Sequence, residues 1–336
     1  NAQKIINEKK ISKTQVINFD KFKKIIGDLK GANFIIDNQS CSVFSEKVIK
    51  SQFKILNKTD PIYKFKSIKN SCELKYMVEA HKKDGLALTK FIYWIKNINK
   101  KKITEVDAQN KLEKFRKMHN NYLYPSFNTI AGSGSNGAIV HYRATKNNTK
   151  IINKKEIFLC DSGGQYQYGT TDVTRTICFS EQSKEIKDIF TKVLKGHIAV
   201  ALTNLNSDNT GKKIDLRARK FLKKDGLDYA HGTGHGVGFF LNVHEGPQSI
   251  SKFNSIKIEE GMVLSNEPGF YKKNHFGIRI ENLVYVKRTQ NNLHFKNLTL
   301  APIEKDLINY NLLNKIEKDY LFRYHLSIYS QYSSSL

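Results

Sequence analysis

Two aspartates are the first residues whose type and spacing suggest chemistry. Asp161 and Asp172 lie eleven residues apart across a glycine-rich stretch, and hydrophobic runs flank both of them. This pattern predicts a β-hairpin in which the two side chains lie opposite each other, with Cβ atoms about 4.5 to 5.5 Å apart. Carboxylates that close repel each other unless a cation lies between them. A pair of divalent metal ions, about 3.5 to 4 Å apart, fits such a gap; the alternative is a pair of exposed aspartates beside an ordinary turn.

A second segment, residues 229–247, contains three of the chain's ten histidines, His231, His235 and His244. Its glycines allow the backbone to approach a ligand closely. Neutral imidazole is a good ligand for transition metals, and its pKa of about 6.5 also suits proton transfer. A phosphate-binding loop is disfavoured because neither a Lys-Ser/Thr pair nor a helix-forming run follows the glycines. Three purely structural histidines remain the weaker alternative.

Two glutamates extend this set of candidate ligands. Glu267 lies directly before a Pro-Gly pair, and Glu281 lies in an apolar strand segment, where Arg279 points to the same face. Taken alone, each glutamate would be interpreted as a solvated strand residue. Two aspartates, one histidine and two glutamates, each in a glycine-rich apolar segment, together offer oxygen and nitrogen ligands that suit two Mn²⁺, Co²⁺ or Zn²⁺ ions.

The elements that must position these residues are helices and strands in irregular order. The spacing of apolar residues predicts helices at residues 20–29, 72–95, 105–118, 186–201 and 216–222. Thr104 and Asp107 predict a capping box at the start of the helix at 105–118. Gly226 is typical of the residues that end a helix, here the last one predicted. Strands are predicted at residues 34–37, 156–160, 173–179, 237–243, 262–266 and 278–286. The lack of regular alternation favours an α+β fold over a doubly wound sheet.

The beginning of the chain is interpreted as the end of a larger domain. Residues 1–68 are expected to hold one strand and two helices of an α/β domain, which are too few to close a core. Pro61 and the polar stretch that ends at Asn70 mark the boundary. Since position 1 is Asn and not Met, we expect a fragment or a processed form, with any targeting signal outside this chain.

The composition argues against several classes of protein. The 336 residues are 39% hydrophobic, which is enough for a real core and excludes intrinsic disorder. No stretch approaches the roughly 18 to 20 apolar residues of a membrane helix, so no membrane association is expected. Four scattered cysteines argue against a disulfide framework or a cysteine-based zinc site, and favour a reducing compartment. The net charge is +25, but lysines occur everywhere and no basic stripe with interleaved aromatics stands out, so no nucleic-acid partner is expected.

Several segments, in their order along the chain, resemble those of a known family. These segments are residues 67–77 and 136–141, the two motif segments above, the two glutamate segments, and residues 323–325. The chain resembles the Xaa-Pro aminopeptidases (aminopeptidase P) of the three-domain eukaryotic type, in the pita-bread metallopeptidase clan. The resemblance implies a pita-bread catalytic domain at residues 69–305 and a C-terminal extension at 306–336. It implies that residues 1–68 are the truncated remnant of a creatinase-like N-terminal domain.

The resemblance also implies a role for each candidate residue. Two divalent metal ions are expected, with Mn²⁺ favoured and Zn²⁺ or Co²⁺ as alternatives. Their implied ligands are Asp161, Asp172, His235, Glu267 and Glu281. Asp172 and Glu281 would bridge both ions, and Glu267 would also transfer a proton. The implied substrate-site residues are His141, His231, His244 and Arg279, the three histidines with a catalytic role as well.

The implied activity is release of the first residue from peptides with proline at position two, by attack of a metal-bridging hydroxide. The family also implies a homodimer and, together with the cysteine usage, a cytoplasmic location. Prolidase (Xaa-Pro dipeptidase) and methionine aminopeptidase share the five ligands and remain alternatives within the enzymes. A catalytically silent pita-bread binding module is the alternative from another class, and the five intact ligand positions argue against it.

Overall fold

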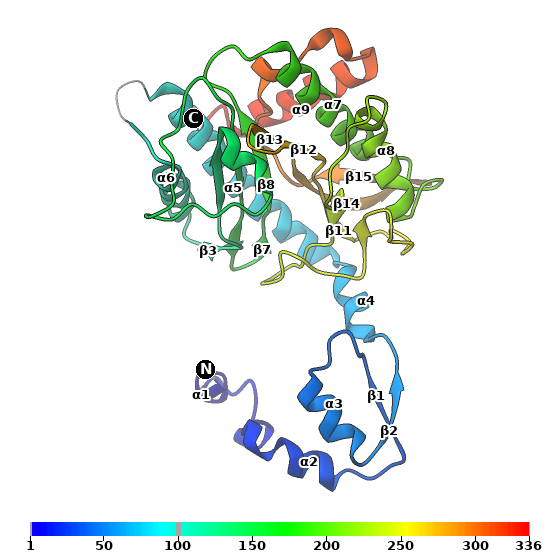
Figure 1. The fold of residues 1–336 in the computed structure, drawn as a ribbon. Coiled ribbons are helices and arrows are strands. Elements are labelled where there is room, and N and C mark those ends of the chain that lie inside the picture. The colour runs from blue at the N-terminus through cyan, green and yellow to red at the C-terminus, as the bar shows by residue number, and fades with distance from the viewer. Residues whose placement is uncertain (1, 99–101, 336) are drawn as a thin grey trace. The chain divides into compact units, whose positions relative to one another are not determined.

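The computed structural model of the chain describes residues 2–98 and 102–335. The backbone forms two compact units, Asn1–Ile62 and Tyr63–Leu336, which are described separately here (Figure 1). All nine candidate site residues belong to the larger unit.

The N-terminal unit is a small α/β arrangement. Strands β1 (Asn33–Ile36) and β2 (Lys54–Asn57) pair in parallel, and helix α3 (Val43–Lys50) connects them. The other helices are α1 (Ala2–Asn7) and α2 (Phe22–Asp28). The core consists of Ile26, Ile36, Ile49 and Phe53. The prediction of a single strand is therefore wrong, because β2 has only two apolar residues and no alternation that would predict a strand.

The larger unit contains the four helices that the apolar spacing predicts there, and two that were not predicted. The predicted helices are α5 (Ser71–Asn97), α6 (Glu105–Lys117), α7 (Lys184–Ala201) and α8 (Gly211–Lys223). The other two are α4 (Pro61–Ser67), which begins at the boundary between the units, and α9 (Lys315–Tyr332). The predicted capping box is confirmed, since Thr104 accepts from the backbone N–H of Asp107 and the Asp107 carboxylate accepts from that of Thr104. Gly226, with a φ of 71°, lies in the turn that follows α8.

The strands of this unit form several small sheets. One sheet has the order β4 (Ile130–Ser133), β5 (Phe158–Ser162), β8 (Val173–Ile177), and another has the order β11 (Val263–Asn266), β14 (Asn282–Thr289), β15 (Asn292–Asn297). A third has the order β3 (Tyr122–Pro125), β6 (Gly164–Tyr166), β7 (Gly169–Thr170). The two pairs are β9 (Gly234–His235) with β10 (Ser249–Ile250), and β12 (Gly269–Lys272) with β13 (Phe276–Arg279). The mixture confirms the predicted α+β class.

Two predicted strands differ from the structure. Residues 237–243 form an irregular loop with bends instead of a strand, because the backbone N–H of Gly238 donates to the carbonyl of Asn242 and closes the segment on itself. The strand predicted at residues 278–286 is interrupted between β13 and β14. At the interruption the N–H of Ile280 donates to Pro268 and that of Glu281 donates to Thr174, so the chain changes partners at Glu281.

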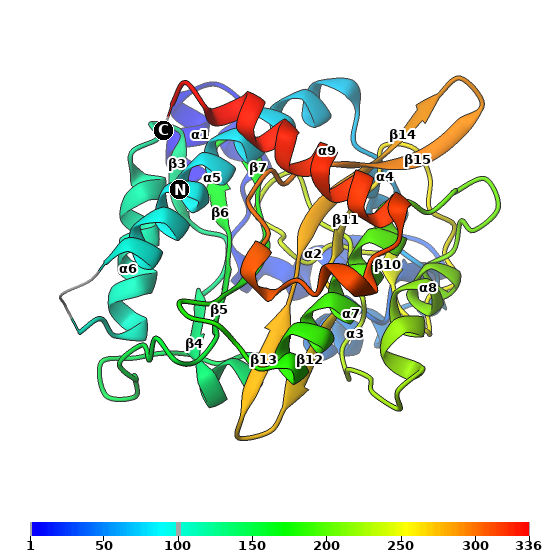
Figure 2. The ribbon, with the colours of Figure 1, turned by 90° about the horizontal axis from the view of Figure 1, so that it is seen from above.

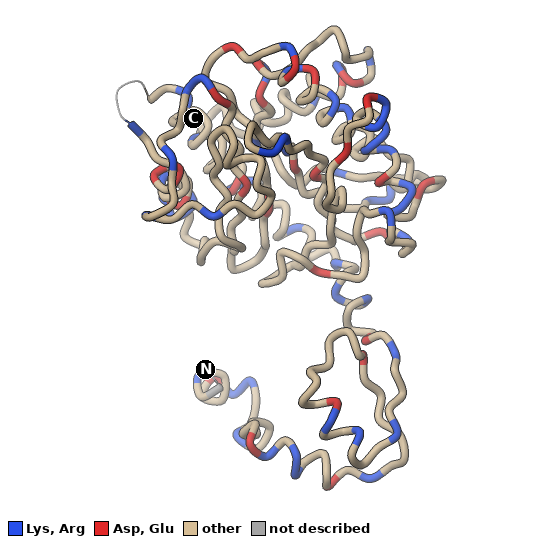
Figure 3. The backbone as a smooth tube through the Cα atoms, viewed as in Figure 1, with Lys and Arg blue, Asp and Glu red and all other residues tan. Residues whose placement is uncertain are grey.

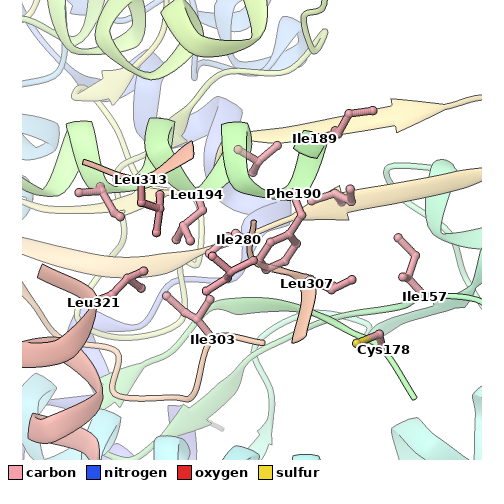
Figure 4. Close-up of a cluster of buried hydrophobic side chains, with 14 of the residues drawn as sticks. Ile157, Cys178, Ile189, Phe190, Leu194, Ile280, Ile303, Leu307, Leu313 and Leu321 are labelled. Atoms are coloured by element: carbon pink, nitrogen blue, oxygen red, sulfur yellow. The ribbon is translucent and has the colours of Figure 1, made fainter. Parts of the chain in front are cut away.

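The largest hydrophobic cluster lies between α7, β13 and α9. Phe190 and Leu194 of α7 pack with Ile280 and with Leu321 of α9 (Figure 4). Helix α9 runs across this part of the unit in the view from above (Figure 2). The cluster therefore fixes β13 and Ile280, the residue that follows it. Ile280 lies between two candidate site residues, Arg279 and Glu281, so their backbone is fixed as well.

Charged residues of both signs are distributed along the chain. Lys and Arg residues occur on helices, strands and loops along the whole tube, interspersed with acidic residues (Figure 3). Among the described residues, no helix combines the length and the apolar character that a membrane crossing requires.

Candidate metal centre

The two aspartates meet at adjacent antiparallel strands, but not directly opposite each other. Asp161 on β5 pairs with Thr174 on β8, and Asp172 lies just before β8. The prediction of directly opposed aspartates is therefore wrong by two residues, because the intervening residues form β6 and β7, which join β3 instead of a symmetric hairpin. Diagonal neighbours still share one face of the sheet. Both side chains belong to residues that are buried, at 8% and 4% exposure.

His235 and Glu267 approach this pair from β9 and from the end of β11. His235 Nε2 lies 3.4 Å from Asp172 Oδ2 and 3.4 Å from Glu267 Oε1. Its Nδ1 lies 2.9 Å from the carbonyl oxygen of Gly236, which can only accept a hydrogen bond. The Nδ1 proton is held by that carbonyl, so Nε2 presents its lone pair to the two carboxylates, as a metal-ligating imidazole does.

Glu281 completes the group from the break between β13 and β14. Ligand atoms of Asp172, His235 and Glu281 all lie within 4.8 Å of one another. The hydroxyl of Thr174 donates to Glu281 Oε2 over 2.7 Å. The Glu281 residue is 1% exposed, so its carboxylate is held in place inside the protein.

Arg279 lies behind the carboxylates and connects them to the surrounding structure. Its Nη2 donates to Asp161 Oδ2 over 2.6 Å, and its Nε donates to the Thr174 hydroxyl over 3.0 Å. The other oxygen of this aspartate, Oδ1, is buried and has no hydrogen-bond partner among the described residues. A buried oxygen with an unused acceptor capacity is costly, and a bound cation would satisfy it.

Electrostatics also favour a cation at this position. Burial raises the pKa of Asp172 well above its ordinary value, and the charges of Asp161 and Glu267 raise it further. Burial and the charges of Asp172, Glu267 and Asp161 likewise raise the pKa of Glu281. Four carboxylates with one guanidinium leave excess negative charge, which divalent ions would neutralise. The donor set of carboxylate oxygens and one imidazole nitrogen fits such ions.

The other predicted site residues line the same cavity. A cavity of about 480 Å³ is lined by all five candidate ligands and also by His141, His231, His244 and Arg279. The rings of His235 and His244 are 4.2 Å apart in an edge-to-face arrangement. His141 is exposed to the cavity. The structure thus brings together every residue that the sequence predicted for the site.

His231 has both ring nitrogens occupied. Its Nδ1 donates to the carbonyl of Gly232 over 2.7 Å, so the hydroxyl of Tyr271 donates to Nε2 over 2.8 Å. Tyr271 in turn accepts from Arg279 Nη1 over 2.6 Å. Burial lowers the pKa of His231, which favours this neutral form. Burial also lowers the pKa of His244, and the neighbouring His235 lowers it further.

Tyr271 and the apolar wall of the cavity were not predicted. Tyr271 lies on β12, whose antiparallel register with β13 pairs it with Gly277 and makes it a diagonal neighbour of Arg279. No motif in the sequence marks it. The remaining wall includes the mostly apolar residues Phe127, Ile130, Val140 and Tyr142, together with the polar Asn128. These residues come from loops and strand ends whose spacing is not periodic, so only the tertiary structure places them.

A second group of possible metal ligands has a different explanation. Cys178, Glu304 and Asp306 have ligand atoms close together. The ammonium group of Lys96 lies among them, 2.8 Å from Glu304 and 3.2 Å from Asp306. A resident protein cation therefore satisfies these carboxylates.

Comparison with protein families defines the class to which this fold and site belong. Residues 75–288 match metallopeptidase family M24, and residues 291–336 match the C-terminal region of peptidase M24. The chain belongs to the M24 metallopeptidases, and its α+β fold is the pita-bread fold of that family.

The relatives within this family are peptidases. The chain is 42% identical over 351 residues to an uncharacterized peptidase of Schizosaccharomyces pombe, covering 98% of this chain and 59% of that protein. It is 42% identical over 320 residues to a probable Xaa-Pro aminopeptidase P of Laccaria bicolor, covering 91% of this chain and 50% of that protein. The chain thus spans about half the length of these relatives.

Solved structures give the same family. An X-prolyl aminopeptidase from Caenorhabditis elegans, described as a cytosolic enzyme with a di-nuclear active site, superposes with a TM-score of 0.81 at 32% identity. The match covers 94% of this chain and 52% of that one. The prolidase from Pyrococcus furiosus superposes with a TM-score of 0.70 at 27% identity, covering 85% and 81%. The fold is therefore shared by enzymes of both names.

Proposed function

We propose that this chain is a dinuclear metal aminopeptidase that releases the N-terminal residue from peptides with proline at position two. The observation that supports this most strongly is the convergence of five candidate ligands and three histidines on one cavity. The Xaa-Pro amide is tertiary and has no N–H. A general protease that binds that N–H handles such a bond poorly, so a dedicated site is reasonable.

Two divalent ions would be held by Asp161, Asp172, His235, Glu267 and Glu281. The oxygen-rich donor set favours Mn²⁺, with Zn²⁺ or Co²⁺ as alternatives. The unpartnered Asp161 Oδ1 and the crowded, buried carboxylates support this assignment. When bound, such ions supply a water of lowered pKa and polarise the scissile carbonyl.

The side chains around the ligands would handle the proton and the substrate. Glu267, whose Oε1 faces His235, would take the proton of the attacking water and pass it to the departing proline nitrogen. Because both nitrogens of His231 are engaged, we assign stabilisation of the oxyanion to His244. His231 then keeps Tyr271 in place. His141, which is exposed in the cavity, would bind the substrate backbone.

The decisive experiment compares three peptides, Xaa-Pro-Pro, Xaa-Ala-Pro and the dipeptide Xaa-Pro. The protein is stripped of metal and reloaded with Mn²⁺, and Glu267→Ala serves as the inactive reference. Glu260→Ala is the matched control, because Glu260 is an exposed glutamate that pairs only with Arg288 among the described residues. Release of the first residue from Xaa-Pro-Pro alone, lost only in Glu267→Ala, supports the proposal.

Two other outcomes would contradict it. Cleavage of the dipeptide would assign prolidase activity, which the structural likeness to a prolidase makes the second candidate. Bound metal without turnover of any peptide would favour the catalytically silent binding module.

The assembly and location are also proposals. We expect a cytoplasmic homodimer, and the C. elegans relative is described as cytosolic. Sedimentation would show the mass of a monomer if the dimer is wrong. We expect no complex with nucleic acid, and a mobility shift that weakens with salt would contradict this. We also propose that residues 1–68 are the end of a creatinase-like domain, which a comparison of the longer chain would test.

A further inference from the structure

The segment that carries His141 has little regular structure of its own. It runs from the end of β4 through a short 3-10 helix, η3 (Gly134–Ala138), and then as a loop to Lys150. His141 is exposed, and within residues 2–98 and 102–335 no side chain or backbone group forms a hydrogen bond with its ring. The position of this imidazole therefore depends on what holds the backbone on either side of it.

A single buried carboxylate holds this segment through four of its residues. Glu105, the first residue of α6, is 0% exposed. Its Oε1 accepts from the backbone N–H of Ser133 over 2.8 Å and from Asn136 Nδ2 over 2.9 Å. Its Oε2 accepts from the hydroxyl of Tyr142 over 2.8 Å and from the backbone N–H of Lys150 over 2.9 Å. The start, the middle and the end of the segment are thus tied to one side chain.

The contact at Tyr142 brings this anchor next to His141. Tyr142 follows His141 directly in the chain and is 5% exposed, so its ring is fixed in the interior. Asn136 Nδ2 also donates to the Tyr142 hydroxyl over 2.8 Å, which closes a ring of hydrogen bonds with Glu105. One peptide unit therefore separates a fully satisfied buried network from an exposed imidazole in the cavity.

The donors to this carboxylate are all neutral. They are two backbone N–H groups, one amide and one phenol, and the position at the start of α6 adds the favourable end of the helix dipole. Glu105→Gln keeps the size and shape of the side chain. However, an amide would turn one acceptor oxygen into a donor facing the donors that it now satisfies, and a buried N–H without a partner is costly. This substitution therefore loosens the segment without emptying the site.

We propose that Glu105 is a positioning residue that fixes His141 for substrate binding through Tyr142. This inference rests on the proposed function, in which His141 binds the substrate backbone. It assigns no contact between Glu105 and substrate or metal. The effect of Glu105 on catalysis should therefore pass through His141 alone.

A double-mutant cycle tests this statement. Glu105→Gln and His141→Ala are compared singly and together, by kcat and KM for Xaa-Pro-Pro and by metal content. Each single change should raise KM and lower kcat/KM about 10- to 100-fold, since a misplaced substrate-binding group has costs of this order. The double variant should be no worse than His141→Ala, and all forms should keep the metal content of the unmodified chain.

Glu113→Gln is the matched control, because Glu113 lies on the same helix, is half-buried and hydrogen bonds to Tyr122 outside the segment. It should change kcat/KM less than twofold. If Glu105→Gln fails to fold, Tyr142→Phe replaces it, since this change removes only the hydroxyl that donates to Glu105 and should raise KM about threefold to tenfold.

The outcomes separate this inference from the proposed function. If Glu105→Gln, or Tyr142→Phe in its place, lowers kcat/KM by the same factor with and without His141, the role is merely structural and the inference is wrong. Unchanged KM in these variants would also overturn it. Absence of turnover in the unmodified chain would overturn the proposed function and this inference with it. Normal turnover in His141→Ala would overturn the role of His141 while leaving the other site residues in place.

Discussion

A buried ion pair next to His244 makes a strong prediction about stability. Lys69 Nζ lies 2.6 Å from Glu245 Oε1, and the two side chains are 1% and 2% exposed. The backbone N–H of Glu245 donates to Gly236, so this residue anchors the turn segment between His235 and His244. Changing one partner leaves a buried charge without its counter-ion, whereas changing both removes the charges together.

The structure indicates by how much each substitution should lower the free energy of unfolding. Removal of one partner of a buried pair costs about 3 to 5 kcal/mol. Lys69→Met should cost an amount near the lower value, because a second cation still faces the carboxylate. Lys66, with a side chain 46% exposed, remains 3.2 Å from Glu245 Oε2. In Glu245→Met, the Lys69 ammonium would keep one hydrogen-bond partner among residues 2–98 and 102–335, the carbonyl of Ser67, 3.4 Å away. The double variant should lose at least about 2 kcal/mol less than the sum of the two single losses.

The pH dependence of Glu245→Met has a definite sign. Burial already lowers the pKa of Lys69, while Glu245 opposes this shift. Without Glu245 the pKa should fall further below that of the unfolded chain, so the unfolded chain binds more protons. Stability of this variant should therefore rise with pH up to about 10.5.

Urea unfolding followed by tryptophan fluorescence measures these values. Trp94 is the only tryptophan of the chain and lies on α5 in the larger unit, so it reports on the unit that contains the site. Single losses below about 1 kcal/mol, or a double loss equal to their sum, would refute the reasoning, because the pair would then behave as an exposed one.

Three further predictions concern the site and the core. Removal of metal by a chelator should abolish peptidase activity and lower Tm. Asp172→Asn should raise the Tm of the metal-free protein, because it relieves repulsion among buried carboxylates. Calorimetry with and without Mn²⁺ checks both Tm changes, and a lower Tm of metal-free Asp172→Asn would contradict the second. Burial and the charge of Arg175 lower the pKa of His197 to about 3, so the unfolded chain binds the proton more strongly and stability is lost as pH falls below 6.5. Between pH 7 and pH 5 this loss should be about 2 kcal/mol, and urea titrations of His197→Gln should show a loss smaller by that amount. Gly85→Ala should destabilise the protein by about 1 to 3 kcal/mol despite better helix propensity, because its Cβ would lie 2.3 Å from both the Leu300 carbonyl and the Tyr332 hydroxyl; thermal unfolding that shows a gain would refute this.

The sequence predicts best what local chemistry decides. The capping box at Thr104 depends on residues three positions apart, and long helices such as α5 and α7 depend on apolar spacing within one element. The candidate ligands were found because each lies in a distinct glycine-rich apolar motif, and the structure does gather them around one cavity.

Strand register and contacts between distant segments could not be predicted from local sequence patterns. The offset between Asp161 and Asp172 arises because β6 and β7 pair with β3, which lies about forty residues earlier in the chain. Residues 237–243 have an apolar pattern typical of a strand, yet a hydrogen bond within their own backbone closes them into an irregular loop. The role of Glu105 could not be predicted from the sequence, because its hydrogen-bond partners lie 28 to 45 residues away.

Three buried carboxylates of this unit differ in what sets their pKa, and the difference distinguishes two of the candidate ligands from a structural carboxylate without any family. Asp84 is buried, which would raise its pKa, but hydrogen bonds and charge from Arg116 and Tyr166 outweigh burial and lower it. Such a carboxylate has its charge and its hydrogen bonds satisfied by protein groups, and its role is structural. For Asp172 and Glu281, burial and neighbouring carboxylates act in the same direction and raise the pKa. A chain keeps such groups together in its interior at a cost in stability, and a bound cation is the partner that would recover that cost.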